Sequence, residues 1–392
     1  MQHLAKKGLL NKLSQLKTGQ IILYDQGQHY PFGQEGSLSA TVHVNNPAFY
    51  SKVVTQGSLG IAKAYIDGDW HTDNLTTLIR IMIQNEQAMS KLDPLYTKLP
   101  QFFWDILAKI KRNTITRSRE HIHAHYDLVN DFFQTFLDET LLYSCALFNT
   151  PDESLQSAQL RKINKIVEKL SPQPQDKILE IGTGWGTLAL YLAQNYGCHV
   201  TTTTISEQQY RYVNERIQAL NLQNKVTLLK QDYRLLQGQY DKIVSIEMIE
   251  AIGHQYFDTF FSQCDRLLKP GGLLMIQAII MNEQTYNRAK EHVDFIKKYI
   301  FPGSCLPSIE RIGQSVANHT NLQWLSLTDI GRHYTTTLLH WYERFMQNLA
   351  QVRQLGFSDE FIRIWQYYLC YCAAGFQEDY ISDVQMVLRK RF

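Results

Sequence analysis

The sequence predicts an α/β protein: a doubly wound, mostly parallel sheet in the C-terminal part, preceded by a smaller α+β domain. Three observations support this fold class. Residues 177–194 have the pattern of a buried strand, a glycine-rich turn and a helix. Strands and helices then alternate to residue 280, as in a sheet with helices on both faces. Short strands are followed by helices in residues 21–85. We therefore expect two domains, at residues 1–115 and 116–392.

Composition limits the class of protein further. With 392 residues, each domain has material for a substantial core. The formal net charge of +2 does not suit a chain that is basic throughout, so we expect no nucleic-acid partner. The six cysteines are scattered without a Cys-x-x-Cys pair, which is typical of a reducing compartment and argues against structural zinc. Aromatic residues make up 12% of the chain, and they suit either an apolar tunnel or an ordinary core.

The sequence suggests contact with a membrane surface rather than passage through a bilayer. No apolar stretch approaches the ~20 residues that a spanning helix needs. Residues 1–10 hold too short an apolar run for an export signal. We therefore expect a cytoplasmic protein, soluble or peripheral to the inner face of the membrane. Residues 1–22 predict a basic amphipathic helix, which rests on an anionic membrane or packs on its own domain.

A second candidate for membrane contact lies at the expected domain boundary. Residues 102–112 alternate large apolar groups with cations, and Arg117 and Arg119 add positive charge. Apolar burial and attraction to anionic lipid would both favour a membrane surface. The alternative is an interdomain helix with a solvated basic face.

Histidines occupy every second position in residues 121–125, a spacing that would place all three side chains on the same face if the segment were a strand. Because the continuation from Asp127 has a helical pattern, we expect no metal site here. His125 is a candidate either to face a lipid head group or to cap a turn.

The N-terminal domain should contain few elements. Strands are expected at residues 21–24 and 40–44, around a turn-rich segment at 26–36. Helical patterns follow, and the second of them closes in a glycine turn at Gly68; they cover residues 47–54, 58–70 and 75–85.

The C-terminal domain should contain a seven-stranded sheet. A helix at residues 153–170 leads into the strand at 178–181. Four more strands of the parallel part are expected at residues 198–205, 226–232, 241–247 and 273–280. Helices are expected between them at 206–222 and 256–268. Residues 322–327 and 384–388 suit an edge pair, separated by long helices at 335–355 and 359–374.

The glycine-rich turn predicts a cofactor. Gly182, Gly184 and Gly186 permit close approach of a ligand, and the helix that follows offers free N–H groups. Dinucleotides and S-adenosylmethionine (SAM) both use such turns. Glu180, just before the first glycine, suits a cationic ammonium and disfavours a pyrophosphate. The spacing also departs from Gly-x-Gly-x-x-Gly, so the residues favour SAM.

Other cofactor contacts should come from the same edge of the sheet, because ligands of open α/β sheets bind at the carboxyl ends of the strands. Hydroxyl, amide and aromatic groups there suit adenosine, although the second strand has no terminal acid for the ribose. The candidates at this edge are Thr203, Thr204, Gln209, Asp232, Tyr233 and Glu247.

Several separated motifs together resemble the cyclopropane-fatty-acyl-phospholipid synthases, with the mycolic acid cyclopropane synthases as relatives. The matching segments are residues 143–145, 180–186, 204–206, 231–234, 299–307, 334–338 and 341–345. Residues 65–70 are similar to the lipid-binding N-terminal domain of this family. The resemblance implies a class I SAM-dependent methyltransferase with a Rossmann-like catalytic domain, and it suggests a homodimer. It also adds Tyr143 and Ser144 to the cofactor-binding candidates.

The resemblance further implies the reaction. A methyl group passes from SAM to a cis double bond of an unsaturated phospholipid in an anionic membrane, and the resulting carbocation loses a proton as the ring closes. Members of the family hold a bicarbonate as proton acceptor. By motif matching its ligands here are Cys145, Glu250, Tyr334 and the main chain of Ile279. Each has a simpler alternative, such as a buried cysteine, a helix-start carboxylate or a core tyrosine.

Two positions depart from the family pattern. Gln277 stands where many members have a histidine that binds bicarbonate, and Ala251 replaces another histidine. An amide still donates a hydrogen bond, so Gln277 stays in the expected catalytic set. Two rival functions remain: methylation of a lipid or small amine without ring closure, and lipid binding by a chain with a vestigial SAM fold.

Overall fold

The computed structural model describes residues 2–86, 130–150 and 152–392. These residues form two compact units that are interleaved along the sequence. The first unit combines the described residues up to 86 with 291–300 and 341–380. The second combines 130–290, 301–340 and 381–392. The expected functional boundary at residue 115 stays a prediction.

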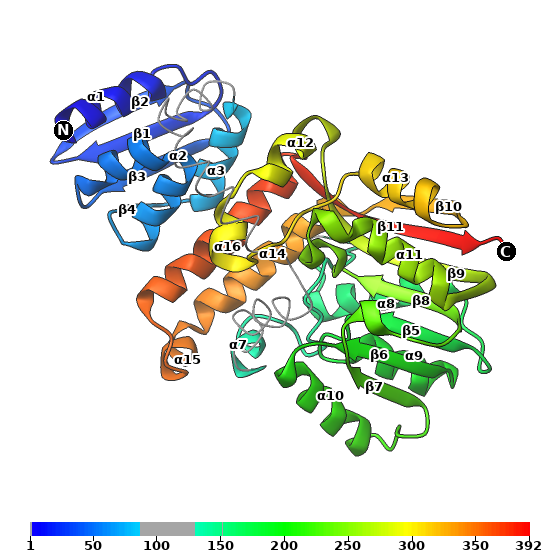
Figure 1. Ribbon diagram of the computed structural model, residues 1–392. Coiled ribbons are helices and arrows are strands. Elements are labelled where there is room, and N and C mark those ends of the chain that lie inside the picture. The colour runs from blue at the N-terminus through cyan, green and yellow to red at the C-terminus, as the bar shows by residue number, and fades with distance from the viewer. Residues whose placement is uncertain (1, 87–129, 151) are drawn as a thin grey trace. The chain divides into compact units, whose positions relative to one another are not determined.

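The first unit contains a four-stranded sheet of order β2-β1-β3-β4 (Figure 1). Its N-terminal elements are α1 (Gln2–Leu13), β1 (Gln20–Asp25), β2 (Gln28–Gly33), β3 (Ser39–Val44), α2 (Ala48–Ile66), β4 (Trp70–Thr72) and α3 (Leu75–Gln84). Of the two alternatives for the N-terminal helix, the structure favours packing on its own unit, because Leu9 and Leu13 are buried and Lys6 pairs with Asp25 at 2.6 Å.

One local expectation for this unit was wrong. The turn-rich segment 26–36 contains β2, which pairs antiparallel with β1. Because β2 is an edge strand, it tolerates polar side chains and Pro31. The segments expected at 47–54 and 58–70 form α2, and Gly57, whose φ of 57° is not helical, separates its two helical parts as the sequence predicts.

The first unit also takes in helices from late in the chain, namely α15 (Leu349–Gln354), α16 (Asp359–Gln377) and a π-helical turn at Ile296–Ile300. α16 packs against α3 and α2. Arg80 pairs with Glu378 at 2.6 Å, and the Arg363 guanidinium donates to the Ile66 carbonyl at 2.6 Å. These contacts join residues almost 300 positions apart, and so a contiguous stretch of sequence does not describe this unit.

The second unit is built on a seven-stranded sheet of order β10-β11-β9-β8-β5-β6-β7 (Figure 1). Its strands are β5 (Lys177–Ile181), β6 (His199–Thr204), β7 (Val226–Lys230), β8 (Tyr240–Ile246), β9 (Leu268–Met281), β10 (Leu322–Asp329) and β11 (Ile381–Lys390). The five strands from β5 to β9 are parallel, and β11 pairs antiparallel with both β9 and β10. The expected mostly parallel sheet with an antiparallel edge pair is confirmed.

Helices cover both faces of this sheet. They are α7 (Asn130–Gln134), α8 (Leu155–Leu170), α9 (Thr187–Tyr196), α10 (Glu207–Ala219), α11 (Phe257–Leu267), α12 (Glu283–Glu291) and α13 (Ile309–His319), with short 3₁₀ turns at Tyr233–Leu235, Ile249–Ile252 and His254–Tyr256. α14 (Gly331–Gln347) begins in this unit, and its residues from Trp341 belong to the first.

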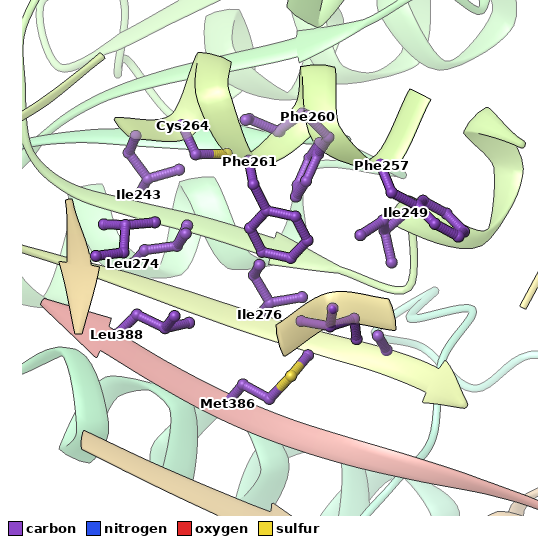
Figure 2. Packing of buried hydrophobic residues seen from close by; sticks show 14 of the residues in the cluster. Ile243, Ile249, Phe257, Phe260, Phe261, Cys264, Leu274, Ile276, Met386 and Leu388 are labelled. Carbon is purple, nitrogen blue, oxygen red and sulfur yellow. The ribbon is translucent and has the colours of Figure 1, made fainter. Parts of the chain in front are cut away.

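The alternation of side chains along the strands builds two cores. Leu179 and Ile243 face one core with α11 and α13, while their neighbours Ile178 and Val244 face the other with α8, α9 and α10. Figure 2 shows aromatic side chains of α11 directed toward the strands of the first core. With both faces covered, ligands have access to this parallel sheet at the ends of its strands.

Two of the expected membrane or metal segments, residues 102–112 and 121–125, lie outside the described residues. Within the described part of the chain, no helix is long and apolar enough to cross a bilayer.

Candidate active site

The turn between β5 and α9 has the backbone conformation that its glycines predict. Gly182, Gly184 and Gly186 have φ values of 98°, 52° and 84°, which side-chain-bearing residues rarely adopt. A Cβ at Gly186 would lie 2.9 Å from Val213, whereas a Cβ at Gly184 would meet no atom within 4 Å. The turn is therefore packed on the α10 side and open at Gly184, where a ligand can approach the backbone.

Glu180 lies at the floor of this turn. Its carboxylate accepts a hydrogen bond from the Thr202 hydroxyl at 2.5 Å. Only 3% of the residue is exposed, and burial raises the pKa of its carboxyl to about 8. A cation brought beside Glu180 would stabilise the ionised form, as expected for a contact with the ammonium group of SAM.

A pocket opens at the carboxyl ends of β5, β6, β7 and β8. It is lined by eleven of the twelve predicted cofactor-binding residues, which are Tyr143, Ser144, Glu180, Gly182, Gly184, Thr203, Thr204, Gln209, Asp232, Tyr233 and Glu247. The twelfth, Gly186, instead serves as the N-cap of α9. Sequence analysis missed Thr183, whose buried hydroxyl lines the pocket and has no hydrogen-bond partner among the described residues.

Side-chain contacts within the protein restrict the roles of several of these pocket residues. Asp232 holds the guanidinium of Arg234 through two hydrogen bonds, at 2.8 and 2.6 Å. The ring of Tyr233 packs edge-on against Phe260 in the hydrophobic core. The Thr204 hydroxyl donates to the Gln209 side chain at 2.8 Å, which fixes both on the adjacent wall.

A buried lysine, Lys162, also lines the pocket, and the sequence analysis did not identify it. Lys162 is 1% exposed, and its ammonium donates to the Ser144 hydroxyl at 2.5 Å. Burial lowers the pKa of Lys162, and the nearby charge of Glu247 is the largest effect that opposes this lowering. The sequence could have indicated this residue, because Lys162 lies on the buried, mostly apolar face of α8, where a lysine is unusual.

Three predicted catalytic groups converge on Glu247. Its carboxylate accepts hydrogen bonds from the Cys145 main-chain N–H at 2.8 Å, the Gln277 amide at 2.7 Å and the Tyr334 hydroxyl at 2.5 Å. The expectation grouped Cys145 and Tyr334 around a bicarbonate, with Gln277 in place of a histidine ligand. In the structure these donors are directed at a carboxylate of the protein itself.

The Cys145 thiol belongs to the buried wall of this site. Burial raises its pKa well above the usual range, so the thiol stays neutral. Its sulfur lies 3.3 Å from the Ala146 carbonyl oxygen. Cys145 therefore reaches Glu247 through its main-chain N–H, and its neutral, buried thiol is not placed as a nucleophile.

Glu250 and Ile279, the other expected anion ligands, bond to each other. One oxygen of Glu250 accepts from the Ile279 N–H at 2.5 Å, and the other has no hydrogen-bond partner among the described residues. Burial and the nearby Glu247 charge raise the pKa of Glu250 to about 8.

Asp383 belongs to the same polar cluster, and no sequence pattern pointed to it. It is fully buried on β11 and accepts from the Gln277 amide at 2.9 Å. Burial and the charge of Glu247 raise the pKa of Asp383 well above its usual range. Gln385, two positions along β11, donates to the side-chain oxygen of Gln277 at 3.0 Å. This hydrogen bond fixes the orientation of the Gln277 amide.

The expected bicarbonate does not fit this arrangement. Its proposed donors at Cys145, Gln277 and Tyr334 already bond Glu247, and the main chain of Ile279 bonds Glu250. His125, also expected at the site, lies outside the described residues. Within the described ranges, no group of three or more His, Cys, Asp or Glu side chains has an arrangement that could hold a metal ion.

Comparison with known proteins gives consistent matches. Residues 113–386 match the family model of mycolic acid cyclopropane synthetase. The chain is 38% identical to the cyclopropane-fatty-acyl-phospholipid synthase of Escherichia coli (strain K12) over 367 residues, which are 91% of this chain and 89% of that protein. It is 35% identical to the tuberculostearic acid methyltransferase UfaA1 of Mycobacterium tuberculosis over 368 residues, covering 91% and 84% of the two chains.

A solved structure agrees with these sequence matches. The mycolic acid cyclopropane synthase CmaA1, complexed with SAH and CTAB, superposes with a TM-score of 0.65 at 31% identity. The superposition covers 69% of this chain and 98% of that one.

Proposed function

The chain belongs to the mycolic acid cyclopropane synthetase family, and we propose that it converts a cis double bond in an unsaturated phospholipid acyl chain to a cyclopropane ring. The expected fold class is confirmed: the protein is a class I SAM-dependent methyltransferase, and homology supports methylene transfer to lipid double bonds. The proposal adds the phospholipid substrate. The observation that carries it is the 38% identity to the Escherichia coli phospholipid enzyme across 91% of this chain.

The geometry of the pocket supports this chemistry. An alkene has no acidic proton for a base to remove, so catalysis depends on holding the SAM methyl group against the π bond. Glu180 and the glycine turn would hold the ammonium end of SAM, and the hydroxyl and amide groups of Thr204 and Gln209 suit its adenosine. Apolar side chains of Leu142, Ile163, Ile166, Met248 and Ile252 line the same pocket and suit a hydrocarbon chain.

The remaining expectations are part of the proposal. Residues 1–115 would form a lipid-binding domain with a basic linker, and 116–392 the catalytic domain. The protein would act on the cytoplasmic, anionic face of a membrane, peripherally attached, and as a homodimer. The basic apolar segment 102–112 supports attachment because it supplies both cations and hydrophobic area. The family resemblance implies bicarbonate as proton acceptor, but its expected donors already bond Glu247 and Glu250, so the proposed reaction does not depend on it.

A second function, methyl transfer without ring closure, is favoured by one observation. Gln277 replaces the histidine of many members, and a relative of similar identity is named a tuberculostearic acid methyltransferase. Proton loss from a different carbon of the same cation would leave a double bond in place of a ring.

One experiment separates the two functions. The purified protein is incubated with labelled SAM and vesicles of unsaturated phospholipid, and the fatty acids are then analysed by mass spectrometry before and after hydrogenation. Both reactions add one CH₂, but a cyclopropane resists mild hydrogenation, whereas a methylated alkene takes up hydrogen. Absence of any labelled fatty acid, with SAM binding intact, would contradict both functions and favour a lipid-binding protein without this activity.

A further inference from the structure

We propose that the Glu247 carboxylate is the proton acceptor of the reaction, in the place that the family resemblance assigns to bicarbonate. This inference rests on the proposed transfer of a methyl group to an alkene. It concerns the step that follows transfer, when the carbocation must lose a proton.

The hydrogen bonds around Glu247 define an anion site that the protein fills itself. The donors come from three separate parts of the second unit: the loop at Cys145, strand β9 at Gln277 and helix α14 at Tyr334. Their donor–acceptor distances are 2.8, 2.7 and 2.5 Å. A carboxylate and a bicarbonate offer the same planar pair of oxygens, so these donors serve one or the other.

Glu247 also lies at the cofactor pocket, where the methyl group would be transferred. It directly follows β8 and lines the cofactor pocket together with Met248, whose side chain would lie 3.2 Å from a Cβ at Gly182. Its backbone has a φ of 46°, in the left-handed region that glutamate seldom adopts. The main-chain N–H donates to the Gln277 carbonyl at 2.8 Å and holds this conformation. Such strained residues gather at functional sites.

The charges facing Glu247 oppose a second anion. Asp383 and Glu250 lie near it, and the pKa of each is raised by burial and by the Glu247 charge. With a pKa of about 8, Glu250 is mainly neutral near pH 7 in the free protein. Lys162 is the buried cation of this cluster, and the Cys145 thiol is neutral. A bicarbonate would place another negative charge beside Glu247 in this buried cluster, next to Lys162, whose charged form burial disfavours.

The step balances without another reactant. The alkene π pair forms a bond to the SAM methyl carbon, and the S–CH₃ pair goes to sulfur. A C–H bond of the transferred methyl group then breaks. Its electron pair closes the ring onto the cationic carbon, and its proton goes to a Glu247 oxygen. Loss of a proton from a neighbouring chain carbon to the same oxygen would instead give the methylated alkene.

Two Glu247 variants and a bicarbonate-free assay test the proposal. Turnover of the full-length protein should change less than ~2-fold when bicarbonate is added to carbon-dioxide-depleted buffer. Glu247→Gln should lose ~100-fold or more in product formation while still binding SAM by calorimetry. Glu247→Gly suits the left-handed backbone and frees the donors, so added bicarbonate or formate should restore part of its activity. Glu215→Gln, on the exposed face of α10, is the matched control and should not respond to either anion.

Equilibrium dialysis with labelled bicarbonate gives a readout that does not need turnover. The wild-type protein should retain no label, and Glu247→Gly should retain it. Label retained by the wild type, a strict need for bicarbonate, or full product formation by Glu247→Gln would each overturn the proposal. If the wild type makes no lipid product at all, the proposed function fails, but the dialysis result still decides whether Glu247 occupies the anion site.

Discussion

Replacement of Glu180 by glutamine should weaken SAM binding and, at the same time, stabilise the free protein. Burial raises the pKa of this carboxyl to about 8, and the hydrogen bond from Thr202 opposes that rise only in part. At pH 7 the free protein therefore holds Glu180 mainly protonated. The ammonium group of SAM favours the ionised form, so binding and ionisation are coupled.

The two free energies fix the size of the effect on binding. A hydrogen bond to a charged group contributes up to ~3 kcal/mol. Ionising a carboxyl whose pKa is about 8 costs about 1.4 kcal/mol at pH 7. The difference between these two free energies predicts that Glu180→Gln binds SAM ~10-fold more weakly than the wild type at pH 7. Above pH 8 the wild-type carboxyl is already ionised, so the variant should bind SAM ~100-fold more weakly. Wild-type affinity should rise with pH up to about 8 and then level off, whereas the variant should show no such rise.

The effect on stability has the opposite sign. An acid whose folded pKa is raised contributes its full stability below the unfolded value of 4.5 and loses it as the pH rises toward 8. At pH 7 the loss is at most ~3 kcal/mol, because the unfolded chain ionises freely and the buried group does not. A neutral glutamine avoids this loss and keeps a hydrogen-bonding group beside Thr202. The cofactor-free variant should therefore melt at a higher temperature than the wild type at pH 7.

Calorimetric titration with SAM and SAH from pH 6 to 9, with thermal unfolding of the cofactor-free proteins, measures both effects. Glu215→Gln again serves as the control, since it removes an exposed carboxyl from the same unit. Equal SAM affinity of wild type and Glu180→Gln at every pH would refute the assignment of Glu180 to the ammonium group. A lower melting temperature for the variant would refute the argument from burial.

Further predictions concern the remaining polar groups and the membrane. Glu250→Gln should abolish ring formation yet leave SAM affinity within ~2-fold, since its carboxylate bonds Ile279 rather than lining the cofactor pocket; fatty-acid analysis and calorimetry test the two parts. Tyr334→Phe removes one donor to Glu247 and should lower kcat ~10-fold with KM unchanged, and a change confined to KM would contradict this. The protein should float with anionic vesicles at low salt and less at high salt, and failure to float at low salt would count against the basic segment 102–112.

The sheet of the second unit was predictable because its signals are local. Ile178 to Ile181 and their counterparts in later strands form apolar runs bounded by turns, and the glycine turn marks the first crossover. The assignment of late helices to the first unit was not predictable. α16 presents an apolar face, but an amphipathic pattern does not specify which partner covers it, and here the partners are α2 and α3. The edge strand β2 escaped detection because its exposed positions place few demands on its residues.

The candidate site also has a part that the sequence predicted and a part that it did not. The carboxyl-end rule and the motifs located Glu180, Gln277, Tyr334 and Glu247, but they assigned Glu247 to the cofactor. The direction of its side chain depends on a left-handed backbone at the end of β8 and on donors from segments more than 85 residues away. No local pattern encodes that. Asp383 was missed for a related reason: a lone acid in a strand has no signal until β9 brings Gln277 beside it. The Gln277 amide donates to two carboxylates, those of Glu247 and Asp383. The role of Gln277 therefore depends on residues that the motif does not contain.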